Sequence, residues 1–201
     1  MTVDPNQHDS FFLSQRIRPV VNQYEFSTAE GQPPFCFVEQ KRFKFKEDIG
    51  FFADETKATE LMRLKARQRF DPAARYDVTA PDGERIGQIQ KQFGSSLLRS
   101  TYTLYDSAGN ETATAREKSL AVALFRRLAG FIPYVGNFAD WLPIPYHFTI
   151  TRDGEQLGLQ SRRNWRLRDT YDIDLTADTA RTLDRRLVLA LAVGLDALQA
   201  R

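Results

Sequence analysis

The chain has 201 residues, of which 42% are hydrophobic and 27% charged, and its formal net charge is +2 at pH 7. This length suits one large all-β domain, and the composition is that of a globular protein with a real core, which does not favour disorder beyond the chain ends. The small net charge excludes a global field that would attract nucleic acid, so any electrostatic function must be local.

The chain carries few signals for a particular compartment. The single Cys36 excludes an internal disulfide and suits a reducing, cytoplasmic environment. Residues 1–10 include Asp4 and Asp9 and lack a basic-then-apolar pattern, so we expect a flexible lead-in there, not a signal peptide, ahead of one domain over residues 11–201. The longest apolar run, Leu187 to Leu195, is about half of the roughly 20 residues that a membrane-spanning helix needs.

A hairpin pattern recurs along the chain: aromatic and β-branched alternation, an acidic residue, a glycine and a second alternation. The turn glycines of the four readable copies are Gly31, Gly83, Gly109 and Gly154. A fifth copy, from Phe51 to Ala66, has Asp54 and Glu55 but no glycine in its turn. The irregular spacing argues against a solenoid or a propeller and favours a meandering antiparallel barrel.

Alternation also predicts which side chains face the interior of this barrel, because successive strand residues point to opposite faces. The apolar residues that we expect to face inward are Phe37, Phe43, Phe45, Met62, Leu64 and Ala66. The basic residues that we expect to face outward between them are Arg42, Lys44, Lys46, Arg63, Lys65 and Arg67. The outer face would then carry two basic stripes.

Two stretches change from strand alternation to helical spacing. Residues 119–131 predict a short amphipathic helix with Arg126 and Arg127 on its polar face. From about Asp178 onward, leucines cover almost the whole circumference of a second helix, which therefore needs burial on every side. Threading this helix through a closed sheet would bury it, so we expect a mainly β fold: a closed antiparallel barrel around a hydrophobic C-terminal helix.

The most specific motif is the strand from Tyr171 to Leu175 followed by the apolar run from Leu187 to Asp196. Together with the repeated aromatic, aspartate and glycine turns, it resembles the LURP-one-related and phospholipid-scramblase-like proteins of the tubby C-terminal-like superfamily. The resemblance covers nearly the whole chain and implies a barrel of about twelve strands around a hydrophobic helix. It also implies a link to membranes: tubby proteins bind phosphoinositides through basic residues, scramblases are associated with calcium and lipid movement, and many LURP-one-like members have no settled activity.

Two basic clusters are candidates for holding a phosphate headgroup or an anionic membrane surface. The first comprises Arg162, Arg163, Arg166 and Arg168 around Trp165. The second is the pair of outward stripes at 42–46 and 63–67, if their strands are neighbours, because like charges side by side on a sheet invite an anion. The alternative for both is ordinary solvated surface that also discourages edge pairing.

The segment from Leu120 to Trp141 is the third candidate. An amphipathic helix beside aromatic side chains is typical of a segment in a membrane interface, and equally of a helix that caps an open barrel end. Its aromatic residues, Tyr134, Phe138 and Trp141, could alternatively form a contact surface for a protein partner.

Metal binding and catalysis have weak support. Asp172, Asp174 and Asp178 offer oxygen ligands for calcium, but the glycine turn and the terminal glutamate of an EF-hand loop are missing, and alternation places the first two toward solvent. Neither His8 nor His147 has an evident nucleophile or metal partner. We expect Cys36 to be a buried, unreactive thiol, and we expect neither an enzyme nor a cofactor.

The sequence therefore favours a non-catalytic barrel that binds anionic phospholipid headgroups, or the cytoplasmic face of a membrane, peripherally. The alternative is a protein-interaction scaffold that binds no lipid. Lipid translocation is less favoured, because the C-terminal helix would have to cross a bilayer with charged residues around a short apolar run. Those residues are Asp184, Arg185, Arg186 and Asp196.

Overall fold

The structure is a computed structural model, and it describes residues 3–16, 21–41, 48–67, 74–92, 100–118, 147–163 and 169–199, without the side chains of residues 41 and 196–199. A short 3-10 helix, η1 (Pro5–Gln7), precedes the first strand, and the helix α3 (Arg185–Gln199) follows the last one. The strands are β1 (Ser10–Arg16), β2 (Val21–Ser27), β3 (Cys36–Lys41), β4 (Asp48–Phe52), β5 (Glu60–Ala66), β6 (Arg75–Thr79), β7 (Arg85–Lys91), β8 (Thr101–Tyr105), β9 (Glu111–Glu117), β10 (His147–Arg152), β11 (Glu155–Arg163) and β12 (Thr170–Asp174).

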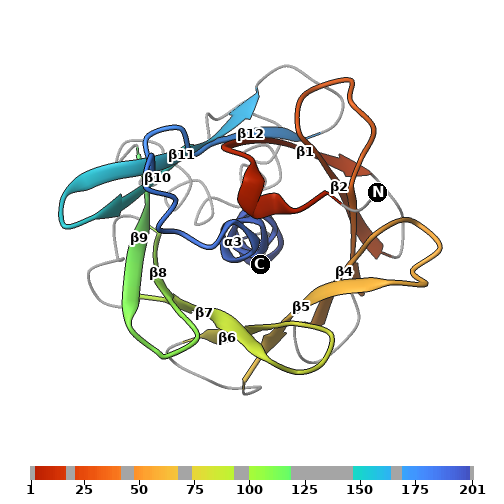
Figure 1. Cartoon of the computed structure of the whole chain (residues 1–201), viewed down its shortest axis with the longest axis horizontal. Coiled ribbons are helices and arrows are strands. Elements are labelled where there is room, and N and C mark those ends of the chain that lie inside the picture. The colour runs from red at the N-terminus through yellow and green to blue at the C-terminus, as the bar shows by residue number, and fades with distance from the viewer. Residues whose placement is uncertain are drawn as a thin grey trace, which may run out of the picture.

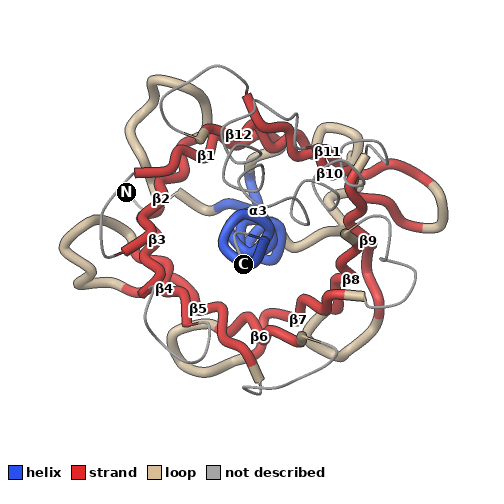
Figure 2. Tube along the Cα trace, turned by 180° about the vertical axis from the view of Figure 1, so that it is seen from behind, coloured by secondary structure: helices blue, strands red, loops and turns tan. Residues whose placement is uncertain are grey.

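The strands form a closed antiparallel barrel. Each strand pairs with the next along the chain, and β1 pairs with β12 to complete the ring of twelve (Figure 1). The helix α3 runs through the middle of the ring, where both views show it surrounded by strands (Figure 2). This confirms the predicted fold class, and closure satisfies the hydrogen-bonding groups that an edge strand would leave exposed.

The helix forms the centre of the core. Its residues from Leu187 to Val193, together with Leu195, are each at most 3% exposed. The β7 backbone comes so close to it that a Cβ added to Gly87 would lie 3.1 Å from the Leu187 side chain and 2.4 Å from the Tyr105 carbonyl oxygen of β8. Each large apolar side chain buried in this way contributes about 1.5–3 kcal/mol before entropy is counted.

The hairpin turns follow the predicted pattern. The four predicted turn glycines have φ between +80° and +91°, the left-handed region that glycine adopts without strain. The β10–β11 turn places both Asp153 and Gly154 there, which suits the twist of a two-residue hairpin. In the fifth turn, where the sequence has no glycine, Lys57 takes the left-handed conformation with φ +60°.

One predicted orientation is wrong. Phe37 faces outward: it lies opposite Glu25 of β2 and Phe52 of β4, while its neighbours Cys36 and Val38 face the core. It is nevertheless only 3% exposed, so this strand is buried on both faces and alternation of apolar residues could not distinguish them. Met62 and Leu64 face inward as predicted, at 3% and 0% exposure, and residues 43 and 45 lie outside the described ranges.

The start of the C-terminal helix also differs from the prediction. It begins at Arg185, not near Asp178, because the Asp178 carboxylate accepts hydrogen bonds from the Thr182 and Leu183 amides, both at 3.0 Å, and thereby holds a turn. Asp184 then caps the helix by accepting the Arg186 amide at 2.9 Å. None of the described helices is long and apolar enough to cross a membrane.

Candidate functional site

The two ends of the barrel are built from different segments. The turn end holds residues 3–9, the hairpin turns that follow β2, β4, β6, β8 and β10, and residues 175–184, which lead into α3. At the connection end, the odd-numbered strands from β1 to β11 each finish and the following even-numbered strand begins. Because α3 starts at the turn end, its last turn points toward the connection end.

The segments that join the strands at the two ends differ in formal charge. The turn-end segments, residues 3–9, 28–35, 53–59, 80–84, 106–110, 153–154 and 175–184, contain eleven acidic and two basic residues. The six stretches that link strands across the connection end, residues 17–20, 42–47, 68–73, 93–99, 119–146 and 164–168, contain ten basic and three acidic residues. The dipole of α3 places only about half a charge at each end of the helix. Compensating this dipole would therefore not require so large a difference in charge between the two sets of segments.

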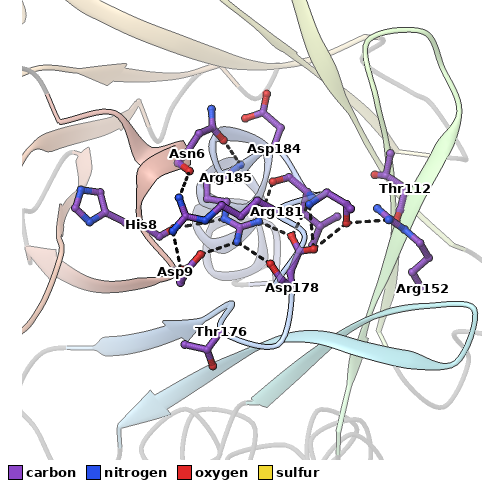
Figure 3. Close-up of polar contacts among 12 residues, drawn as sticks. Asn6, His8, Asp9, Thr112, Arg152, Thr176, Asp178, Arg181, Asp184 and Arg185 are labelled. Carbon is purple, nitrogen blue, oxygen red and sulfur yellow. Dashed lines mark hydrogen bonds and ion pairs between the residues drawn. The ribbon is translucent and has the colours of Figure 1, made fainter.

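A buried ion-pair network closes the turn end (Figure 3). Arg185 is fully buried and donates to the Asp178 carboxylate, to Asp9 Oδ1 at 2.9 Å and to the Leu183 carbonyl oxygen at 3.0 Å. Its amide donates to Asn6 Oδ1 at 2.9 Å. The N-terminal segment, the turn before α3 and the first residue of the helix are therefore tied together at one guanidinium.

The Asp178 carboxyl group of this network is ionised at neutral pH. Burial alone would raise the pKa of Asp178, but hydrogen bonds from the Leu183 and Thr182 amides, from Arg185 and from the Thr182 hydroxyl outweigh it and lower the pKa to about 2. Arg152 adds a link from the wall, donating to Thr182 Oγ1 at 2.8 Å. These contacts hold the segments of the turn end together, so their role is structural.

The structure places only part of the predicted cluster at 162–168. The Arg162 Nε donates to Asp169 at 3.1 Å. Arg163 binds Asp172, with 2.7 Å from Nη2 to Oδ1, and also Glu30, and these carboxylates raise the pKa of its guanidinium. Arg166, Arg168 and Trp165 lie outside the described residues. The two described arginines are thus already neutralised by acids.

The strand that precedes the first predicted stripe, β3, and the strand that carries the second, β5, are not neighbours, because β4 lies between them. On β5, Arg63 is held by Glu60 at 2.8 Å and by Asp48 at 2.9 Å. Arg67 lies 2.7 Å from Asp77, and the exposed Lys65 is opposite an aspartate on each neighbouring strand. The stripe at Arg42, Lys44 and Lys46 lies outside the described ranges.

The three candidate calcium ligands have separate tasks. Asp172 binds Arg163, Asp174 accepts the Thr176 amide at 2.9 Å, and Asp178 binds Arg185. Among the residues that the structure describes, no three His, Cys, Asp or Glu side chains gather as metal ligands would.

The candidate catalytic groups are also dispersed. Cys36 is 2% exposed and faces the core, and burial raises its pKa to about 12, as expected for an unreactive thiol. His147 lies on the outer face of β10, where partial burial and then the charge of Lys118 lower its pKa. His8 packs edge-on against Phe11 at the turn end. The predicted interaction surface of Tyr134, Phe138 and Trp141, with the segment around it, lies outside the described residues.

The structure adds two hollows that the sequence did not indicate. A polar groove of about 820 Å³ runs along the outer wall between β9 and β10, with Arg116 and Lys118 at one end. A smaller, mainly apolar cavity of about 220 Å³ lies at the turn end between η1, the wall and α3. Alternation along residues 112–118 places Arg116 outward, but only the strand register reveals what lies beside it.

One comparison with known proteins, that with models of protein families, gives a match. The family model described as LURP-one-related matches residues 36–196, from the first residue of β3 into α3. No curated protein and no solved structure matches the chain.

Proposed function

The chain belongs to the LURP-one-related family, and we propose that it is a non-catalytic barrel that binds anionic phospholipid headgroups peripherally through its connection end. The observation that carries this proposal is the difference in formal charge between the segments that join the strands at the two ends of the barrel. The stretches that link the strands at that end contain ten basic and three acidic residues, whereas the segments of the opposite end contain eleven acidic and two basic residues.

Electrostatics gives this arrangement both affinity and orientation. A basic residue close to an anionic leaflet contributes about 1 kcal/mol, and the attraction fades beyond a Debye length of about 8 Å at physiological salt. An end with a clear basic excess therefore gains several such contributions, while the acidic end is repelled. A barrel with this distribution would stand with α3 roughly along the membrane normal and its C-terminal turn nearest the lipid.

Arg162 and Arg163 are weaker candidates for the lipid contact than the sequence suggested, because both are engaged by carboxylates. The stronger candidates are basic residues of the linking stretches, among them Arg166, Arg168, Lys44 and Lys46. Peripheral binding is preferred to lipid translocation because α3 would have to leave a mainly apolar surrounding and break the Arg185 network.

The test is co-sedimentation with vesicles of neutral phosphatidylcholine or of phosphatidylcholine mixed with phosphatidylserine, at low and high salt. We expect binding to the anionic vesicles only, weakened by salt and by the double change Arg166→Glu and Arg168→Glu. A second variant adds Glu84→Lys and Glu155→Lys, two exposed turn-end positions, which restores the wild-type net charge.

The charge-restored variant separates a directed surface from simple net charge. If the connection end is the binding surface, this variant stays as weak as the double variant. Recovery of binding would show that total charge alone decides, and absence of binding of the unchanged protein to anionic vesicles would refute the proposal.

A further inference from the structure

The cavity at the turn end has an apolar floor and a charged rim. The residues of its floor are each at most 8% exposed, and they are Phe35, Cys36, Met62 and Leu189. The charged residues of its lining are Asp4, on the N-terminal segment, and Arg186, on α3. Asp4 is exposed and the Arg186 side chain is 38% exposed, so the cavity meets solvent at these two residues.

The wall that the N-terminal segment contributes is fixed in place. Residues 3–5 line the cavity, and the residues that follow them are tied to the start of α3. Asn6 Oδ1 accepts the Arg185 amide at 2.9 Å. The Asp9 carboxylate accepts Arg185 and Arg181, both at 2.9 Å. The cavity is therefore preformed, and a ligand loses no affinity to the ordering of this segment.

The floor suits an apolar ring better than it suits water. A buried water molecule typically makes about three hydrogen bonds, whereas the floor consists of a phenyl ring, a thioether, a thiol and a leucine side chain. The thioether and the thiol make favourable contacts with aromatic rings. A cavity of about 150 Å³ holds benzene, so the volume of about 220 Å³ has room for about nine non-hydrogen atoms.

The rim carries more acid than base. Arg186 is held by Asp184, with 2.6 Å from Nη2 to Oδ2 and 3.0 Å from Nε to Oδ1. These hydrogen bonds, and then the charges of Asp184, Asp4 and Glu84, raise the pKa of Arg186. The Asp4 carboxylate accepts the Asn6 amide at 3.0 Å and forms no ion pair with a described residue. Three carboxylates thus surround one guanidinium that is already engaged.

We propose that this cavity binds a small amine with an apolar, ring-sized body, which fills the floor while its ammonium group faces Asp4. An ammonium ion forms a charged hydrogen bond with a carboxylate, so Asp4 determines the specificity of the site. An anionic ligand would be repelled by the acids of the rim, and Arg186 does not offset this because Asp184 holds it. The site goes beyond the membrane proposal, since it lies at the opposite end of the barrel.

The test uses three ligands of nearly equal size that differ in charge: phenethylamine, 2-phenylethanol and phenylacetate. The full chain is titrated with each at pH 7, and binding is followed by calorimetry and by amide chemical shifts. We expect phenethylamine to bind most tightly, 2-phenylethanol about fivefold more weakly, as the loss of a partly exposed ion pair implies, and phenylacetate more weakly still. The shifts should centre on residues 35–36, 61–62 and 189. Ethylamine, which has no ring, should not bind.

Three variants of the chain locate the site. Asp4→Asn removes the charge but keeps the cap of η1, because asparagine also accepts an amide hydrogen bond; it should weaken phenethylamine about fivefold and leave 2-phenylethanol unchanged. The matched control is Asp106→Asn, an exposed aspartate of the β8–β9 turn that accepts the Asn110 amide at 2.8 Å, and it should change neither affinity. Val3→Trp fills the cavity from the N-terminal segment and should abolish binding of both ligands, with thermal unfolding as the check that the barrel is intact.

The proposal is overturned if none of the three ligands binds, or if phenylacetate binds as tightly as phenethylamine. It is equally overturned if Asp106→Asn weakens phenethylamine as much as Asp4→Asn does, because the attraction would then be to the net charge of the protein. Unchanged binding of phenethylamine to a folded Val3→Trp variant would place the ligand elsewhere and would also overturn it.

Discussion

Replacing Arg185 by methionine removes the guanidinium that joins three segments at the turn end. Arg185 is fully buried, and the change leaves the Asp178 carboxylate, whose side chain is 2% exposed, without its cation. Asp178 retains its hydrogen bonds from Thr182 and Leu183, which limits the damage. Breaking one partner of a buried ion pair costs about 3–5 kcal/mol, so we expect a loss of about 3–4 kcal/mol in the free energy of unfolding, a large share of a typical total.

Urea unfolding at pH 7, followed by circular dichroism, measures this loss. Arg181→Met is the matched control, because Arg181 also binds Asp9, at 2.9 Å, but its side chain is 42% exposed. Exposed ion pairs contribute about 1 kcal/mol or less, so the control should lose much less stability. Equal losses for the two variants, or a loss below about 1 kcal/mol for Arg185→Met, would refute the reasoning from burial.

Three further outcomes follow from the core and its closure. The pKa of Asp178 is lower in the folded than in the unfolded protein, so its stabilisation of about 2 kcal/mol is present above pH 5 and is lost as the pH falls toward 2. Asp178→Asn should therefore flatten that part of the curve of unfolding free energy against pH. An unchanged slope would contradict this assignment. Gly87→Ala should cost about 1–3 kcal/mol in thermal unfolding, because its Cβ would lie 2.4 Å from the Tyr105 carbonyl oxygen. Gly158→Ala should cost less, because its nearest contact, at 2.4 Å, is the Leu175 side chain, which can relax, and the Asp174 carbonyl oxygen is 2.9 Å away. Cys36 should react with a thiol reagent only at urea concentrations that unfold the barrel, and rapid labelling of the native protein would be inconsistent with its burial.

The fold could be predicted well because its signals are local. Each turn glycine that the sequence displayed adopts the left-handed conformation, and the helix apolar on all sides lies where only a closed sheet could bury it. The orientation of Phe37 could not be predicted, since apolar residues occupy both faces of β3. The helix start was misplaced because Asp178 and Asp184 are both good capping residues and spacing alone does not choose between them.

The state of the basic clusters could not be predicted, because charge pairing depends on contacts between distant segments. Arg163 meets Asp172 through the register of β11 and β12, and Glu30 across 133 positions of chain. Conversely, nothing local marks Arg116 as distinct from Arg63. Their neighbours across the sheet are also similar, two threonines for Arg116 and a glycine and a threonine for Arg63, and only the folded contacts show that Glu60 and Asp48 neutralise Arg63. The difference in charge between the segments that join the strands at the two ends likewise emerges only when strand directions are known.

The most direct test of the membrane proposal measures which end meets the lipid. Cys36 is buried and unreactive, so a fluorescent label can be attached to a single introduced cysteine, at Ala108→Cys in the exposed β8–β9 turn or at Ser96→Cys in the stretch between β7 and β8. Anionic vesicles carrying nitroxide lipids then report proximity by quenching. We expect quenching at position 96 and none at position 108; equal quenching at both, or quenching at 108 alone, would contradict binding through the connection end.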